Sequence, residues 1–379
     1  MSLHKAVTLK DVAERANVSQ SVVSTILNDR NNGIFVSEST RQNVIAAAAD
    51  LGYVAKHRVL PTVRKPGASV RRTRTETDGH LVGVLLGRRF GGSLFTDIFY
   101  GVNTSLSAAG YHPVVLDTYA DSYTKAAEKE SEALTYALNN DFAGIILWHE
   151  GRNANVQQIK SMRDQMPIVA IDRRVNGVEL DFSGTNNFMG AYEATNHLIN
   201  LGHRRIAHLT RLETTDAAVE RLRGYQQALT DAGIEINPRH IILALESGRR
   251  LDSDMIRQVF TGPGSPTAIF LLADFWAPSM YAEFRSLGLR VPDDVSMVGF
   301  DDVVQPGLEN LGLTTMAQNF EGIGRSAADL VLHRTEDMQR PYSNSIYPAE
   351  LVVRQSTLPP PSCRTERGTV HGRRVTVTN

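Results

Sequence analysis

From His80 onward, the sequence alternates short apolar runs with amphipathic stretches, and this alternation restricts the fold more than any other feature. Leu81–Leu86 is apolar throughout apart from Gly83, as expected of a strand that is buried on both faces. Asp97–Ala109 has apolar residues at helical spacing and is followed by Gly110, a residue that favours the end of a helix. Strands that alternate with helices in this way form parallel sheets with helices on both faces.

The same pattern continues to about residue 333. The predicted strands are Leu81–Leu86, Pro113–Leu116, Gly144–Trp148, Ile168–Ile171, Arg205–Leu209, Ala268–Leu272 and Ser296–Gly299. The predicted helices are Asp97–Ala109, Lys125–Leu138, Asn155–Met166, Asn187–Leu201, Ala218–Ala232, Asp252–Phe260, Ala277–Leu287 and Glu321–His333. These seven strands belong to about nine or ten expected in all, which are too many for one small sheet, so we predict two doubly wound subdomains. Ligands are expected at the carboxyl ends of the strands.

Residues 1–60 have a different pattern, with three short helical segments and no predicted strand. Thr8 is placed to cap the first helix, with Asp11 at the capping-box position, and Asn17 ends it. Ser19 and Ser37 are placed to cap the second and third helices. The predicted inward faces are Val12, Ala13 and Ala16; Val22, Val23, Ile26 and Leu27; and Val44, Ile45, Ala48 and Leu51.

The second of these helices has an uncharged polar outer face, which suits the major groove of DNA. The pattern therefore indicates a helix-turn-helix unit, with a plain three-helix bundle as the alternative.

The distribution of charge also distinguishes the N-terminal end of the chain. Residues 1–79 contain 12 Lys and Arg against 7 Asp and Glu, whereas the whole chain has a net charge of −1. Such a split indicates one of two things: a head that binds a polyanion, or a basic linker that is merely solvated.

Composition narrows the class of protein further. The chain of 379 residues has 42% hydrophobic and 21% charged residues, which is typical of a globular protein of two or three domains. The single cysteine, Cys363, excludes an internal disulfide framework and a metal cage of several cysteines. The sequence has neither an apolar run long enough to span a bilayer nor the apolar segment of a signal peptide. We therefore expect a cytoplasmic protein that makes no membrane contact.

Several segments closely resemble the lactose-repressor (LacI/GalR) family of transcriptional regulators. The DNA-binding signature of that family is similar to Thr8–Ser19, Val23-Ser24, Leu27-Asn28, Val36–Arg41 and Leu51–Tyr53. Its regulatory core is similar to Leu201–Ile206, Glu220–Tyr225, Gly288–Ser296, Val298–Asp302, Leu313–Thr315 with Gln318, and Glu350–Arg354. These segments run from about residue 8 to 357 in the order that the family has them.

The resemblance implies a homodimeric repressor that binds double-stranded operator DNA under the control of a small effector, expected to be a carbohydrate. It implies an α/β fold in which an all-α three-helix head precedes a periplasmic-binding-protein-like core of two doubly wound subdomains. Three crossovers join the subdomains, and the ligand lies in the cleft between them. We expect the DNA-binding domain at 1–60, a basic hinge at 61–79, the core at 80–357 and a disordered tail at 358–379.

The resemblance places the DNA contacts in the head and the hinge. Gln20 and Ser21 align with positions that read bases, and Ser19, Ser24 and Asn28 with positions that contact phosphate or cap a helix. The full predicted set is Thr8, Ser19, Gln20, Ser21, Ser24, Thr25, Asn28, Lys56, Arg58 and Leu60. Thr25 stands where the family often has arginine. The hinge also departs from the family, and Leu60 is either a wedge for the minor groove or a packing residue.

For the effector, the resemblance points first to Asp301 and Arg221, with an interdomain salt bridge as the alternative. The full predicted set is Leu94, Phe95, Trp148, Asp172, Arg221, Asp274, Asp301, Gln318 and Phe320. Trp148 either stacks on a sugar ring or packs at the rim of the cleft, as does Trp276, which follows another strand. Asp302 is expected to structure its own loop. Ala273 replaces an asparagine that is common in the family, which leaves the class of ligand open.

Motifs of enzymes are not satisfied. Gly322–Ala327 matches a loosened dinucleotide pattern but lacks the strand–helix–strand context, and we expect it to begin a core helix. No residue is predicted to be catalytic, and no metal or cofactor is expected. The alternative to a repressor is a sugar-binding protein of the periplasmic type without DNA regulation, which residues 1–60 oppose.

Overall fold

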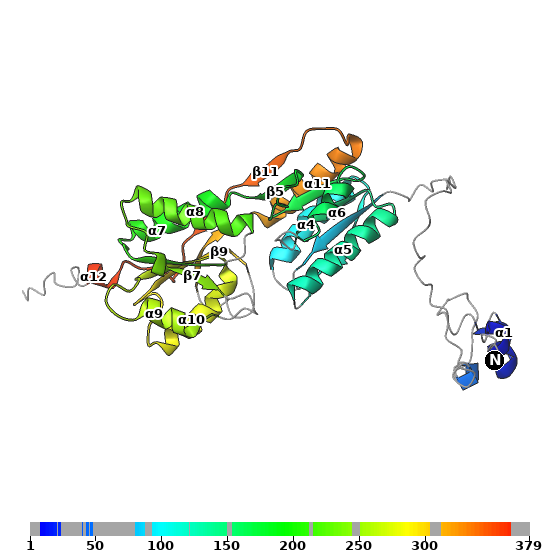
Figure 1. Ribbon diagram of the computed structural model, residues 1–379, viewed down its shortest axis with the longest axis horizontal. Coiled ribbons are helices and arrows are strands. Elements are labelled where there is room, and N and C mark those ends of the chain that lie inside the picture. The colour runs from blue at the N-terminus through cyan, green and yellow to red at the C-terminus, as the bar shows by residue number, and fades with distance from the viewer. Residues whose placement is uncertain are drawn as a thin grey trace, which may run out of the picture. The chain divides into compact units, whose positions relative to one another are not determined.

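The structure is a computed structural model in which two units, Met1–Thr73 and Arg74–Asn379, are distinguished (Figure 1). It describes residues 8–20, 22–23, 40, 43–44, 46–47, 80–87, 93–120, 122–149, 154–211, 215–244, 251–303 and 312–364.

The first unit contains helix α1 (Leu9–Ala16) and parts of two further helical segments. Thr8 caps α1 in a capping box with Asp11, and the backbone of Asn17 turns left-handed with φ of 53°. Side chains from all three segments form one buried cluster: Val12, Ala13, Ala16, Val23, Val44 and Ala47. The cap, the turn and the first inner face are thus as predicted. In the third segment Val44 is buried as expected, Ala47 is an addition, and Ile45, Ala48 and Leu51 lie outside the described residues.

The second unit contains two lobes, each built around one six-stranded sheet. The sheet of the first lobe has the order β11-β5-β4-β3-β1-β2 and is parallel throughout. Its strands are β1 (Leu81–Leu86), β2 (His112–Asp117), β3 (Gly144–Leu147), β4 (Ile168–Ile171), β5 (Asp181–Thr185) and β11 (Asn344–Tyr347). One face packs on α4 (Ser93–Ala108) and α11 (Phe320–Glu336), and the other on α5 (Tyr123–Asn139) and α6 (Val156–Met162).

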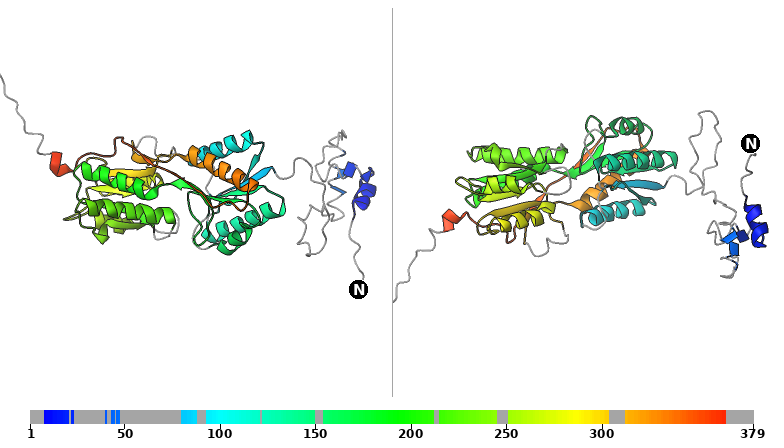
Figure 2. Two further views of the ribbon diagram at one scale, coloured as in Figure 1. Left: turned by 90° about the horizontal axis from the view of Figure 1, so that it is seen from above. Right: turned by 60° about the horizontal axis from the view of Figure 1, so that its bottom comes forward.

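The sheet of the second lobe repeats this order as β12-β10-β9-β8-β6-β7. Its strands are β6 (Ile206–Arg211), β7 (Ile241–Ala244), β8 (Ala268–Leu271), β9 (Ser296–Asp301), β10 (Thr314–Ala317) and β12 (Glu350–Val352). Only β12, among the described strands, runs antiparallel to its neighbour. Helices α7 (Asn187–Asn200) and α8 (Asp216–Asp231) cover one face, and α9 (Ser253–Phe260) and α10 (Ala277–Ser286) cover the other (Figures 1 and 2). Short 3₁₀ turns are η1 (Pro238–His240) and η2 (Asp274–Trp276).

The chain crosses between the lobes three times: after β5, after β10 and after β11. The predicted pair of doubly wound subdomains with three crossovers is therefore confirmed. Helix α11 returns to the first lobe, where it packs closely on α4. A side chain at Gly324 would come within 2.0 Å of the Ile98 carbonyl oxygen, so only glycine permits this approach. The Gly322–Ala327 segment thus belongs to a packed core helix, as predicted.

Five strands are missing from the sequence-based prediction: β5, β7, β10, β11 and β12. They are three to five residues long, and four of them, β5, β10, β11 and β12, carry Asp, Asn, Ser, Thr or Glu, so no continuous apolar run marks these four. Strand β7 is apolar throughout and was overlooked. The predicted helix Asn155–Met166 is also shorter, because α6 ends at Met162. Pro167 follows Met166 and disfavours helical backbone in the residue before it.

The predicted disordered tail is wrong for its first residues. The Leu358 carbonyl oxygen lies 2.8 Å from both His203 Nε2 and the hydroxyl of Ser296, which donates to it. Pro361–Arg364 forms helix α12, and Pro360 and Cys363 lie near Gly202. The second lobe therefore extends at least to Arg364. The basic tract 61–79 and residues 365–379 lie outside the described residues.

The core of the second lobe contains one fully buried histidine. His208 of β6 stacks between Tyr225 and Phe270, with ring centroids 5.1 and 4.8 Å away. Its Nδ1 donates to the Phe270 carbonyl oxygen at 3.0 Å, and its Nε2 has no partner among the described residues. Burial lowers the pKa of His208 from 6.5 to about 4. The folded protein thus holds this ring neutral over a range in which the unfolded chain binds a proton.

We expect acid to destabilise the protein through His208. Because the unfolded state takes up the proton first, stability should fall as the pH drops from 6.5 towards 4, by roughly 2 kcal/mol at pH 5. Thermal midpoints at pH 7.5 and 5 test this for the wild type, for His208→Phe, which cannot titrate, and for His112→Phe at an exposed site. His208→Phe should show a smaller loss at pH 5 than the other two. Equal losses in all three proteins would contradict the role of His208.

Candidate functional site

The described part of the DNA-binding prediction lies on the turn after α1. The left-handed Asn17 reverses the chain, and the backbone N–H of Val22 donates to Ser19 Oγ at 3.4 Å, which starts the second helix. Ser19 and Gln20 are exposed. Thr8 serves as the cap of α1, where its Oγ1 accepts from Asp11 N at 3.4 Å.

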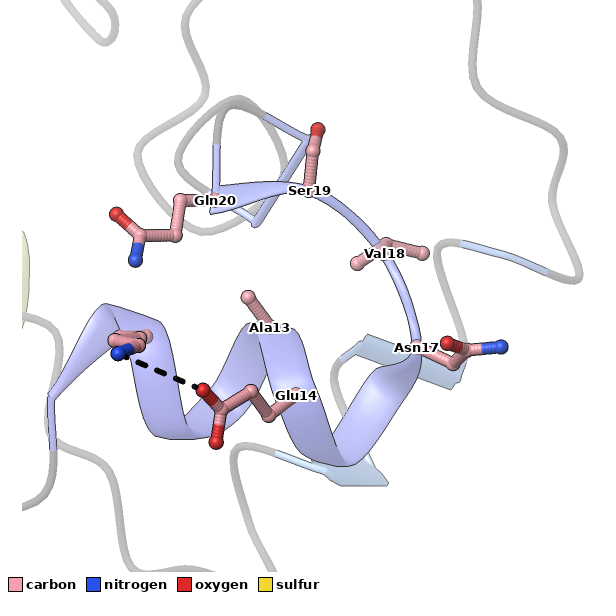
Figure 3. Close-up of a pocket in the computed structure, with 7 residues that line it drawn as sticks. Ala13, Glu14, Asn17, Val18, Ser19 and Gln20 are labelled. Atoms are coloured by element: carbon pink, nitrogen blue, oxygen red, sulfur yellow. Dashed lines mark ion pairs between the residues drawn. The ribbon is translucent and has the colours of Figure 1, made fainter.

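A shallow hollow of about 450 Å³ separates this turn from α1. Figure 3 shows Ser19 and Gln20 on the turn and Glu14 on α1. Glu14 forms an ion pair with Lys10 at 3.8 Å. The side chain of Gln20 is therefore free of the helical core and accessible to a partner. The other predicted DNA contacts lie outside the described residues: Ser21, Ser24, Thr25, Asn28, Lys56, Arg58 and Leu60.

In the second unit, Arg221 is the centre of the predicted effector set. It lies on α8 and is 5% exposed. Its guanidinium donates to Asn187 Oδ1 at 2.8 Å and to the Leu272 carbonyl oxygen at 2.5 Å, and it lies 3.7 Å from the centroid of the Phe300 ring. Asp301 Oδ1 is 3.5 Å from Nη1. Burial lowers the pKa of Arg221, and the carboxylates of Asp301, Asp172 and Asp274 act against that shift.

Asp301 connects Arg221 to the crossovers. It is the last residue of β9, it is buried, and its φ of 123° is unusual for a residue with a side chain. Gln318, which follows β10 at the second crossover, donates from Nε2 to Asp301 Oδ1 at 2.7 Å. The amide oxygen of Gln318 in turn accepts from the hydroxyl of Thr185, the last residue of β5. A continuous polar chain therefore links both lobes to Arg221.

Asp274 lies inside the second lobe and holds the backbone beside Asp301. Its Oδ2 accepts from the N–H groups of Asp302 and Val303 at 2.8 and 3.3 Å, and its Oδ1 accepts from the Thr315 hydroxyl at 2.6 Å. Burial and the charge of Asp301 raise the pKa of Asp274. Asp302 itself pairs with Arg354 at 2.7 Å, and its expected role in the loop stays a prediction, because residues 304–311 lie outside the described residues. Both oxygens of Asp274 are thus bonded to β10 and to the segment after β9.

The remaining predicted residues form two groups. Leu94, Phe95, Trp148 and Phe320 all belong to one buried apolar cluster of the first lobe. Asp172 follows β4 with a left-handed backbone (φ of 62°) and pairs with Arg173 at 3.6 Å, and Arg173 lies 5.8 Å from the Trp148 ring centroid. Trp276 lies apart, in the core of the second lobe. The exposures of 3% for Trp148 and 6% for Trp276 favour packing over an open stacking surface.

Three polar residues near these groups were missed by the sequence analysis. Asn187 bonds Arg221, and Asp216, the first residue of α8, accepts from the backbone N–H of Arg174 at 3.2 Å. His149 follows β3 and pairs with Glu130 at 3.1 Å in full burial. His149 directly follows a predicted strand and Asp216 lies in the segment after another, where ligands were expected, but neither was chosen as a site residue. Asn187 carries no such signal, since its role depends on a contact with a distant segment.

Among the described residues, no group of three or more His, Cys, Asp or Glu side chains is arranged to hold a metal ion. Within the same part of the chain, no helix is long and apolar enough to cross a membrane.

Comparison with known families matches two parts of the chain. Residues 8–56 match the family of bacterial regulatory proteins, lacI family, and residues 195–357 match the periplasmic binding protein-like domain. The first match covers α1 and the turn with Gln20. The second covers Arg221, Asp301 and Gln318.

Relatives are similar over almost their full length. The HTH-type transcriptional repressor PurR of Photobacterium profundum is 27% identical over 92% of this chain and 98% of its own. The HTH-type transcriptional repressor CytR of Escherichia coli is 28% identical over 93% of this chain and 96% of its own. The ribose operon repressor of Haemophilus influenzae is 27% identical over 92% of this chain and 98% of its own.

Two solved structures extend the similarity to the fold. A complex of the transcriptional regulator CelR with cellobiose has a TM-score of 0.63 at 25% identity, covering 92% of this chain and 99% of its own. The lac repressor dimer bound to operator and the anti-inducer ONPF has a TM-score of 0.62 at 24% identity, covering 93% and 100%. The second likeness concerns the fold alone.

Proposed function

Since the chain belongs to the LacI family of bacterial regulatory proteins, we propose that it is a homodimeric repressor whose affinity for operator DNA is controlled by a small ligand. The observation that carries this proposal is the combination of two features in one chain. Residues 8–56 match the lacI family, and the two-lobed core places a polar chain at the junction of its lobes. A sugar or related polyol is the proposed ligand, because a similar regulator is known with cellobiose.

We assign DNA binding to residues 1–60 and ligand binding and dimerisation to the core from residue 80. Exposed Gln20 is the proposed base-reading residue, with Ser19 beside it at the phosphate backbone. The relatives are repressors, and we propose that this chain likewise has no catalytic activity and acts in the cytoplasm.

The ligand is proposed to bind where Arg221 and Asp301 meet. A guanidinium donates and a carboxylate accepts, so the two side chains together suit adjacent hydroxyl groups. Both are buried and lie on the second lobe, while Asp172 on the first lobe is close enough to act on the charge of Arg221. A ligand that contacts both lobes favours one arrangement of them, which is how it would change operator affinity.

Operator binding by the full chain tests the function as a whole. We expect a dimer to protect two half-sites about one helical turn apart, and binding to be lost when residues 1–60 are removed. Gel shifts and footprints on DNA selected from a random pool measure both, with circular dichroism to show that the shortened protein is folded. Retention of DNA binding without residues 1–60, or occupation of a single half-site by monomers, would contradict the proposal.

Gln20→Ala should relax base preference at one operator position, because a glutamine that pairs with adenine contributes about 1–3 kcal/mol of discrimination. Lys56→Ala or Arg58→Ala serves as the comparison, because a lost phosphate contact weakens all sequences and lowers the slope of log K against log salt by roughly 0.9. Affinities for cognate and scrambled DNA at several salt concentrations separate the two effects. An equal loss on both DNAs for Gln20→Ala would show that Gln20 does not read a base.

Asp301→Asn and Arg221→Ala should weaken the response to the effector. A coupling of about 1–3 kcal/mol changes operator affinity roughly 5- to 150-fold, and each variant should need more ligand to reach that change. The measurement titrates wild type and variants with a sugar that raises the thermal midpoint of the wild type, cellobiose and ribose being tried first. The double variant should lose less ligand affinity, in free energy, than the two single variants lose together, since both residues bind one ligand. If both single variants respond at the ligand concentration that the wild type needs, the assignment is contradicted.

A further inference from the structure

One hydrogen bond joins the two lobes away from the crossovers. The backbone N–H of Arg174, in the turn after β4, donates to Asp216 Oδ2 at 3.2 Å. Arg174 belongs to the first lobe and Asp216 begins α8 of the second. Since no crossover segment supplies either partner, this bond forms only when the two lobes are brought together at this place.

The side chain of Arg174 takes no part in the bond. Its Nη1 donates to Asn344 Oδ1 at 2.9 Å, and its guanidinium carbon lies 4.0 Å from the centroid of the Phe182 ring. Both partners belong to strands of the first lobe. The first lobe therefore offers Asp216 a backbone N–H group, while the charge of Arg174 is directed to its own lobe.

The second oxygen of Asp216 makes the contact incomplete. Oδ1 is buried and has no hydrogen-bond partner among the described residues. Burial raises the pKa of Asp216, and so does the neighbouring carboxylate of Asp172, whereas the backbone N–H groups of Arg174 and Ala217 and the charge of Arg174 lower it. Asp172 itself pairs with Arg173 at 3.6 Å. A buried carboxylate oxygen without a donor, beside a second carboxylate, disfavours the arrangement that buries it.

We propose that Asp216 controls the closure of the two lobes, with Oδ2 forming the contact to Arg174 and Oδ1 opposing closure until a hydrogen-bond donor reaches it. The ligand that closes the lobes therefore presents a hydroxyl or amino group to Asp216 Oδ1. This inference rests on the proposed ligand site and adds a residue on the lobe that also carries Arg221 and Asp301. The inference also gives this role to Asp216, which lies outside the segments that resemble the family.

The test measures closure in the full chain without sugar or DNA. Spin labels are attached to Cys363, the single and exposed cysteine on the second lobe, and to Glu132→Cys on the exposed face of α5 in the first. Labelled protein is mixed with excess unlabelled protein so that only distances within one chain are recorded. Distance distributions at pH 8 and 4.5 give the ratio of closed to open chains for the wild type, Asp216→Asn and Asp216→Ala.

Asp216→Asn removes the charge and retains an oxygen that can accept from Arg174, so the ratio of closed to open chains should rise about tenfold at pH 8. In the wild type, protonation of Asp216 should raise the ratio as the pH falls, and Asp216→Asn should show no such rise. Asp216→Ala loses the bond to Arg174 and should be more open than Asp216→Asn at both pH values.

Asp254→Asn is the matched control, because Asp254 is also an acidic residue in the first turn of a helix of the second lobe, α9, but is exposed. It should behave as the wild type. Identical distributions for the wild type and Asp216→Asn at both pH values would overturn the proposal, as would equal closure of Asp216→Ala and Asp216→Asn. Because neither sugar nor DNA is present, these results do not depend on whether the proposed repressor function is correct.

Discussion

The burial of the Arg221 guanidinium is the constraint on which the core of this protein depends. A positive charge removed from water has to be compensated by acceptors on every side. The second lobe supplies them from separate segments: Asn187 at the start of α7, Leu272 after β8 and Asp301 at the end of β9. These segments meet only when the sheet is assembled. Arg221 therefore ties the strand ends of the second lobe together, and loss of any one acceptor leaves part of a buried charge unpaired.

The crossovers extend this dependence to the first lobe. Gln318 accepts from Thr185 of the first sheet and donates to Asp301 of the second, so its carboxamide joins the two strand ends at neighbouring crossovers. An amide is suited to this position because it carries a donor and an acceptor, whereas a carboxylate would face Asp301 with a like charge. Movement of one lobe against the other must alter this bond, the contact of Arg174 with Asp216, or both. Ligand binding and lobe movement thus act on the same few polar groups.

The sequence was sufficient for the parts of the fold that local patterns determine. Continuous apolar runs marked β1 and β9, and the caps at Thr8, Asn17 and Ser19 are as predicted. Strands such as β11 and β12 could not be recognised, because they are short, half-exposed and stabilised by pairing with distant strands. The resemblance identified Arg221, Asp301 and Gln318, which the structure brings together. It gave no indication of Asp216, whose role exists only across the junction of the lobes.

The composition of the junction bears on the kind of ligand that the chain can accept. At Ala273 the family often has asparagine, so this chain lacks one side chain that both donates and accepts. The next residue cannot replace it, because both oxygens of Asp274 are bonded within the second lobe. If the ligand binds as proposed, its polar contacts there come from Arg221, Asp301 and Asp216, one donor and two acceptors. A ligand for such a site must donate hydrogen bonds to two carboxylates, which hydroxyl and amino groups can do and carboxylates cannot.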